Sequence, residues 1–482
     1  MKFKAFHVAV TGALGAVIMA GVGCAGGPVG SSSVPGANGA GGVTVGGATS
    51  GSAQSTAVLI NIGDFASVPE LNAPKVDRIV SFQLTIDSVT FRSSTGDVPW
   101  LSQPRRLELT RLSSRFEPLL VRHVPQGDYS AVVIGVSDPQ ISFIDSSGVL
   151  HENVAPTLAS SSETLNIQLS IGSTPTLFSL VPLADSVSFA DDAVTVTPRF
   201  SLGWPASSVQ IDDLVGSVTS MGSNSFAVCG IGTAYANGTF TFTTDSNTQF
   251  QGVTGVGGLT TGFIVSVSGR PKSDGSLLAT KVKVENNNPS LGLVIEGITL
   301  SMAPGRLQML VRQFSGLGAP SPTVGAALTL DANAATQFRV DRDNVDLNNL
   351  NFTPTFDALN MVLGQNVRVS TTGSDIATSI PFIAEQLTLE PQSFDGIASA
   401  SASGSVSGQF TFTLELSGDS AFAHMTGHNS VLVTLQPSTR MFIFSLGDGC
   451  ISCITNQPVR VRGLLFFSEG QYQLVADQLA EN

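Results

Sequence analysis

Residues 262–284 decide the fold: GFIVSV (262–267) and KVKV (281–284) stand on either side of the turn residues SDG (273–275). Apolar and polar residues alternate in both flanks, as they do in strands that bury one face. The Asp-Gly pair provides the positive φ angles that a tight hairpin requires. The same alternation recurs in SFQLTI (81–86), FTFT (240–243) and VRVR (459–462). From Ala57 onward we find no convincing helix, and we predict an all-β protein.

An internal repeat covers the C-terminal two-thirds of the chain. Its landmarks recur in one order, which is an opening strand, a Thr-x-Phe pattern, a second strand and a final strand led by Ala. The three openings are LVGSV (214–218), IEGI (295–298) and FDGI (394–397); the next landmarks are TQF (248–250), TQF (336–338) and TRM (439–441); the second strands are GFIVSV (262–267), GQNVRV (364–369) and QPVRV (457–461); the final strands follow Ala279, Ala384 and Ala476. A period of about 80 to 100 residues suits one small barrel or sandwich in each copy.

On these landmarks the repeat resembles the bacterial domain of unknown function 5666. The preceding region resembles the domain of unknown function 4382, on LTIDSV (84–89), VPQGDY (124–129) and AVVI (131–134). The resemblance implies an N-terminal antiparallel β-sandwich followed by three small β-barrel-like repeats, of an OB or sandwich type, in a lipoprotein or secreted protein. It implies no known activity. The third copy departs most, with Met441 in place of Phe and Gln457-Pro458 in place of Gly.

The first residues indicate export. Lys2 and Lys4 precede an apolar stretch that ends at Cys24, the arrangement of a secretory signal. The segment resembles a bacterial lipoprotein signal, in which the Cys becomes the lipidated N-terminus, although Gly21 stands where that family usually has Leu. An ordinary signal peptide and an uncleaved membrane anchor remain as alternatives. Residues 25–56 are rich in Gly, Ser and Ala, and we predict a flexible linker there.

The composition restricts the partners that we expect. Charged residues make up only 12% of the 482 residues, and the net charge is −13. Such a chain repels a phosphate backbone, so we expect no nucleic acid to bind. The expected partners are a membrane, reached through the lipidated N-terminus, and an envelope glycan or protein.

Four cysteines and two histidines are candidates for chemistry. If Cys24 is lipidated, Cys229, Cys450 and Cys453 remain in an oxidising compartment. We predict a disulfide between Cys450 and Cys453. The alternatives are a thiol redox site, a longer bridge that involves Cys229, and a zinc site. Zinc would take Cys450 and Cys453 with His424 and His428, whose spacings suit a tetrahedral shell. Met425-Thr426-Gly427 between the histidines indicates a loop, which favours histidines that bind no metal.

Other polar clusters have ordinary interpretations. The run DRDNVD (341–346), followed by Asn348 and Asn349, offers oxygen ligands for calcium but lacks the Gly and the closing Glu of an EF-hand loop. We interpret it as a polar connection, and Asp191-Asp192 and Asp212-Asp213 as solvated turn residues. No nucleophile elbow, HExxH motif or phosphate-binding loop is present. We name no catalytic residue and no cofactor.

The expected organisation is a signal peptide at residues 1–24, a linker at 25–56, a β-sandwich at 57–206 and repeats at 207–291, 292–392 and 393–482. We expect an exported, lipid-anchored protein at the bacterial cell envelope, periplasmic or on the outer membrane, that acts as an interaction or ligand-binding module. A secreted hydrolase or redox protein with a site between modules is one alternative. A purely structural spacer is another.

Overall fold

The structure, a computed structural model, describes residues 55–63, 76–101, 103–112, 116–174, 176–190, 193–203, 211–230, 239–272, 276–289, 292–316, 322–342, 345–373, 382–399, 409–442 and 454–481. This part of the chain is almost entirely β, which confirms the predicted fold class. Within it no helix is long and apolar enough to cross a membrane. The predicted signal peptide, the predicted linker up to residue 54, the predicted turn at 273–275, and Cys24, Cys450 and Cys453 lie outside the described residues.

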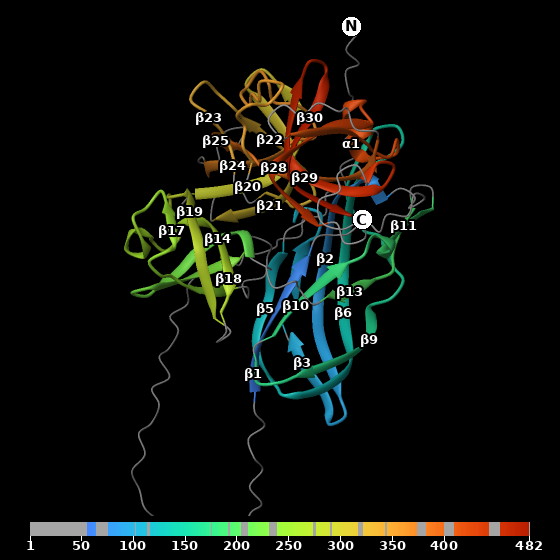
Figure 1. The fold of residues 1–482 in the computed structure, drawn as a ribbon, viewed down its shortest axis with the longest axis vertical. Helices are drawn as coiled ribbons and strands as arrows, with labels where there is room; N and C mark the ends of the chain where they lie inside the picture. The colour runs from blue at the N-terminus through green and yellow to red at the C-terminus, as the bar shows by residue number, and fades with distance from the viewer. Residues whose placement is uncertain are drawn as a thin grey trace, which may run out of the picture.

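Two sheets that share one hydrophobic core form the first module, which is the elongated lower body in Figure 1. One sheet has the order β13-β10-β1-β5, from β1 (Ser55–Gly63), β5 (Phe116–Pro125), β10 (Thr176–Pro182) and β13 (Phe200–Gly203). The other contains β2 (Ile79–Ser93), β3 (Gly96–Leu101), β4 (Arg105–Glu108), β6 (Gly127–Ile144), β7 (Leu150–Val154) and β9 (Ser162–Ile171). A small third sheet contains β8 (Thr157–Leu158), β11 (Val187–Ala190) and β12 (Ala193–Val196).

The sandwich is not wholly antiparallel, which corrects one detail of the prediction. β1 pairs with β10 in parallel, from Val58 opposite Thr176 to Ile62 opposite Leu180. The chain between these two strands forms β5 and the strands of the second sheet, so no hairpin sets the relative direction of β1 and β10. Short 3-10 turns precede β2 and β11, at η1 (Val76–Arg78) and η2 (Ala184–Ser186).

The three C-terminal units have the same strand order. The first is β16-β15-β14-β18-β19-β17, and the second is β22-β21-β20-β24-β25-β23. The third is a closed barrel, β26-β27-β28-β30-β29, in which β28 pairs with β30 through two separate segments, as β16 and β17 both pair with β19 in the first unit.

The bounds of these elements are β14 (Ile211–Met221), β15 (Ser225–Gly230), β16 (Thr239–Thr243), β17 (Gln249–Gln251), η3 (Val256–Gly258), β18 (Ile264–Pro271), β19 (Leu277–Asn286), β20 (Gly292–Ala303), β21 (Arg306–Gly316), β22 (Ala327–Asp331), β23 (Gln337–Val340), β24 (Asn366–Gly373), β25 (Phe382–Leu389), β26 (Gln392–Ala398), β27 (Phe410–Glu415), α1 (Ala421–Thr426), β28 (Ser430–Phe442), β29 (Pro458–Ser468) and β30 (Gln471–Glu481).

One α-helix, α1, interrupts the described part of the third unit, and it corrects the expectation of a chain without helices. Ser420 caps its N-terminus by accepting a hydrogen bond from the Ala423 backbone N–H at 3.1 Å. Gly427 ends it in the left-handed conformation, with φ of 74°. Met425 and Thr426, which we expected in a loop, therefore belong to its last turn. The helix is too short to leave a periodic pattern in the sequence.

Hydrophobic cores cross the borders between units. The core of the second unit includes Leu464, Phe466 and Val475 from the strands of the third. Val294 of the second unit packs with Val215 and Ile264 of the first. The second and third units consequently lie together at one end of the molecule, above the elongated first module, with the first unit beside them (Figure 1).

Candidate functional site

A pocket of about 170 Å³ lies where the first module, the second unit and the third unit meet. The first module contributes η1 with Asp77, the start of β2 and Thr110. The second unit contributes Ile298 and Arg312, and the third contributes β26, α1 and Arg460. A concave site between modules, with apolar walls and a few polar groups, is the usual place for a small ligand.

The apolar wall of this pocket is fixed by the packing of α1. Phe422 packs edge-on against Phe394 of β26, with ring centroids 5.0 Å apart, and against Tyr472 of β30 at 4.9 Å. Gly364 lies against the Phe422 ring, where an added Cβ would come within 2.9 Å of ring carbons. The Ser420 cap therefore fixes the start of the helix that carries Phe422, and Gly364 leaves room for its ring.

Ion pairs surround the pocket. Asp395 and Arg460 form two hydrogen bonds, at 2.8 and 2.7 Å. Arg78 donates to the Asp419 carboxylate at 2.9 Å. The Arg312 Nε donates to the backbone carbonyl of Val80 at 2.9 Å.

The pocket contains the carboxyl group of Asp77, whose pKa is displaced. Burial, reinforced by the charges of Asp395 and Asp419, raises the pKa of Asp77 to about 6. Arg460 and a hydrogen bond with Ser417 act in the opposite direction and are outweighed. A carboxyl group that changes charge near neutral pH in a concave site is a candidate functional group.

A second cluster lies between the first and second units, around Arg368 of β24, whose side chain is 2% exposed. Its guanidinium pairs with Glu296 of β20 at 2.6 Å, with Glu285 of β19 at 2.9 Å, with Glu390 at 3.3 Å and with Asp213 of β14.

Asp213 reaches Arg368 because β14 is irregular at that point. Its φ is 57°, and the register of β14 against β18 shifts between Ile211 and Leu214. Such a bulge turns a side chain toward a new direction. Lys283 extends the network, 3.1 Å from Glu285 and 3.7 Å from Asp341.

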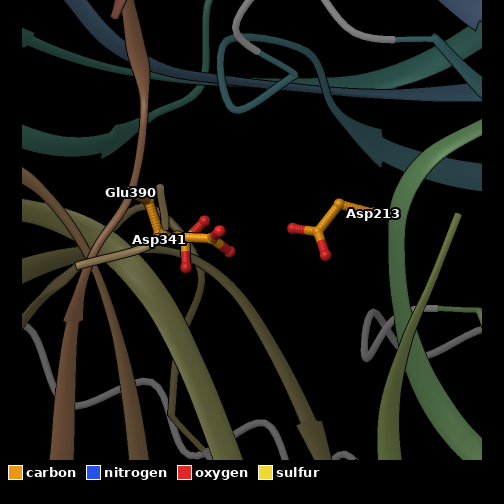
Figure 2. A group of neighbouring side chains, drawn as sticks. All are labelled: Asp213, Asp341 and Glu390. Carbon is orange, nitrogen blue, oxygen red and sulfur yellow. The ribbon is translucent and has the colours of Figure 1, made fainter. Parts of the chain in front are cut away.

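Carboxylates outnumber bases in this cluster, and burial raises the pKa of Glu390 well above its usual value. Ligand oxygens of Asp213, Asp341 and Glu390 all lie within 4.8 Å of one another, and Figure 2 shows Asp213 facing the other two. Oxygen ligands of this kind suit calcium or magnesium. Because Arg368 already pairs with Asp213 and Glu390, we assign the cluster a structural role as an ion-pair network that joins two units.

The two histidines of the zinc alternative have different neighbours. His424 lies on α1 with its Nε2 3.8 Å from Asp419, whereas the His428 ring contacts Phe467 and Tyr472, at centroid distances of 6.0 and 5.2 Å. Cys450 and Cys453 are outside the described residues, so their predicted bridge stays a prediction. Cys229, near the end of β15, is disulfide-bonded.

Sequence reasoning missed both clusters of charge. Asp213, interpreted as a solvated turn residue, is buried against Arg368, and Asp341, interpreted as part of a polar connection, is 9% exposed. Asp77 carried no motif at all. One signal was available, because charged residues are scarce in this chain, at 12%. Glu285, Glu296 and Arg368 nevertheless lie within or directly after predicted strands, which indicates that they are buried as ion pairs.

The model of the domain of unknown function 5666 matches residues 215–283, which covers the first of the three units. No curated protein matches the chain.

Two solved structures similar to the chain are a single-stranded DNA-binding protein from Thermus aquaticus, wild type, and a deletion mutant of it. Each is 10% identical to this chain, with a TM-score of 0.16. Each match covers 40% of this chain, and the matches cover 92% of the wild-type chain and 94% of the mutant chain. Our expected partners, a membrane and an envelope glycan or protein with nucleic acid excluded, need correction: no comparison supports a membrane partner, and the solved structures found belong to a single-stranded DNA-binding protein. The net charge of −13 sums the whole chain and describes no single surface, so it could not exclude nucleic acid. At this TM-score the likeness carries no argument about what the chain binds.

Proposed function

We propose that this chain is an exported β-domain protein that binds a small molecule in the pocket between its modules. The observation that supports the proposal is a concave site where the first module meets the second and third units, with an aromatic wall and the Asp77 carboxyl group. A hydrolase with two acting carboxyl groups is less well supported, because Asp395 is held in a two-bond ion pair by Arg460.

We propose that all three C-terminal units are copies of the domain of unknown function 5666, and that the first module belongs to the domain of unknown function 4382. The common strand order of the three units supports the first part.

Export is proposed from the N-terminal sequence, with Cys24 as the lipid-modified first residue of the mature chain. Palmitate labelling of the wild type and of Cys24→Ser tests this. The wild type should be labelled and the variant should not, whereas an unlabelled wild type contradicts the lipoprotein assignment.

Filling the pocket tests ligand binding. Met425 lines the pocket from α1, and Met425→Trp should occupy its space. Met221→Trp makes the same change at an exposed position on β14, where the side chain is 45% exposed. The measurement is the thermal shift of each protein across a panel of small amines, alcohols, carboxylates and sugars.

We expect at least one compound class to raise the melting temperature of the wild type and of Met221→Trp but not of Met425→Trp. If no compound distinguishes Met425→Trp from the other two proteins, the proposed function is wrong.

A further inference from the structure

We infer that the pocket takes a small organic cation, an amine with an apolar body, whose charge lies against the Asp77 carboxylate and whose body lies against Phe394 and Phe422. This inference rests on the proposed function and adds the chemical class of the ligand.

Every other carboxylate near Asp77 already has a basic partner. Asp395 of β26 is paired with Arg460 of β29, and Asp419, before α1, is paired with Arg78 of η1. Within the part of the chain that the structure describes, no basic side chain forms an ion pair with Asp77. A cation in the pocket would supply that partner in a partly desolvated place, where an ion pair is stronger than in water.

The remaining charged groups around the pocket do not replace this partner. Arg312 of β21 lines the same pocket, with its Nε directed to the Val80 carbonyl. His424 of α1 lies on the side of Asp419, at 3.8 Å from its carboxylate. Around Asp77 itself the charges of Asp395 and Asp419 oppose that of Arg460, and together with burial they raise its pKa to about 6.

The apolar wall sets the size and shape of the ligand. Phe394 and Phe422, 9% and 6% exposed, line the pocket together with Leu416, Ile298 and Met425. A cavity of about 150 Å³ is large enough for one benzene ring, so a volume of about 170 Å³ suits a single ring with a short arm. Aromatic faces also attract organic cations, which favours an amine over a neutral molecule of equal size.

The charge of Asp77 makes the affinity for a cation depend on pH. The carboxylate that attracts a cation is present above pH 6 and is lost as the pH falls through the pKa of about 6. Affinity for a cation that keeps its charge should therefore fall toward tenfold for each pH unit below 6 until the neutral-pocket affinity is reached.

The experiment uses three probes with one ring and different charge, namely benzylamine, benzyl alcohol and benzoate. Binding is measured by calorimetry at pH 7.5 and pH 5.0, in the full mature protein. The proteins are the wild type, Asp77→Asn, and Asp97→Asn as the matched control, because Asp97 makes only a 3.8 Å contact with Arg92 and is 60% exposed.

At pH 7.5 the wild type and Asp97→Asn should bind benzylamine at least tenfold more tightly than benzyl alcohol, and benzoate most weakly. Asp77→Asn should lose the preference for the amine and its pH dependence while its affinity for benzyl alcohol changes little. Melting of Asp77→Asn at pH 5.0, where the wild-type carboxyl is largely neutral, checks that the variant is folded.

Two results would overturn the inference. One is that the wild type binds the three probes equally, or binds benzoate most tightly, while Met425→Trp binds none of them. The pocket would then bind a small molecule, as proposed, but without preference for a cation. The other is no binding of any of the three probes to the wild type. Failure of the proposed function is a separate result. It would require that Met425→Trp respond like the wild type to every compound in the larger panel.

Discussion

Asp77 is a single residue whose buried carboxyl group lowers the stability of the fold when it is charged. Its carboxyl group holds a proton in the folded chain up to a pH of about 6, whereas the ordinary value is 3.8. The folded state therefore binds more protons than the unfolded state between these values. The contribution of Asp77 to stability is fully present below pH 3.8 and is lost as the pH rises to about 6.

Asp77→Asn should remove this loss. We expect the variant to match the wild type near pH 4 and to exceed its free energy of unfolding by about 2 kcal/mol above pH 7. This figure is smaller than the full pKa displacement implies, because Asp77 is partly in contact with solvent. Urea denaturation at the two pH values measures it. Asp97→Asn should show no such gain, and a destabilised Asp77→Asn at pH 7 would contradict the assignment.

Arg368 has the opposite effect on stability. Its removal leaves several buried carboxylates without their base, so Arg368→Met should lower the free energy of unfolding by about 3–5 kcal/mol. The exposed pair of Arg306 with Asp331, at 3.7 Å, provides the control: Arg306→Met should cost less than about 1 kcal/mol. Similar losses for both variants in urea denaturation would show that the Arg368 network contributes little.

At the scale of the element, the three repeat openings contain a glycine for a common reason. An added Cβ on Gly216, Gly297 or Gly396 would come closer than 3.0 Å to a backbone carbonyl oxygen of the next strand, on Cys229, Leu310 and Glu415 respectively. Backbone atoms of a paired strand cannot move aside cheaply. The sequence landmark is thus a place where neighbouring strands approach too closely to leave room for a side chain.

Gly297→Ala should therefore cost about 3 kcal/mol or more, the upper range for overpacking. Gly257→Ala is the matched control, because no atom lies within 4 Å of the added Cβ there. Thermal melting of both variants measures the difference. An equal effect of the two substitutions would mean that the strand crossing tolerates a side chain.

At the scale of the whole molecule, the second and third units form one packing unit. Phe466 belongs to β29 of the third unit but lies in the core of the second, 6.0 Å from the Phe352 ring. Units that share a core in this way unfold together, unlike modules joined only by linkers.

Phe466→Ala should lower the free energy of unfolding by about 3–5 kcal/mol and shift one common calorimetric transition of both units. Phe467→Ala, at the next position of the same strand, removes a side chain that is 37% exposed and should cost less. Two separated transitions, of which only one moves, would show that the units are independent.

The sequence by itself determined the β class, because period-two alternation and turn residues are local signals that survive without any tertiary contact. It also located the repeat landmarks, because the close strand crossings demand glycine wherever they recur. Only the tertiary structure decided where Asp77, Asp213, Asp341 and Arg368 meet their neighbours. Arg368 lies 155 residues from Asp213 and 83 from Glu285, and only the packing of whole units brings these side chains together. The helix α1 followed the same rule: its six residues are too few for a helical period, and its place is fixed by the Ser420 cap and by the burial of Phe422 among rings from β26 and β30.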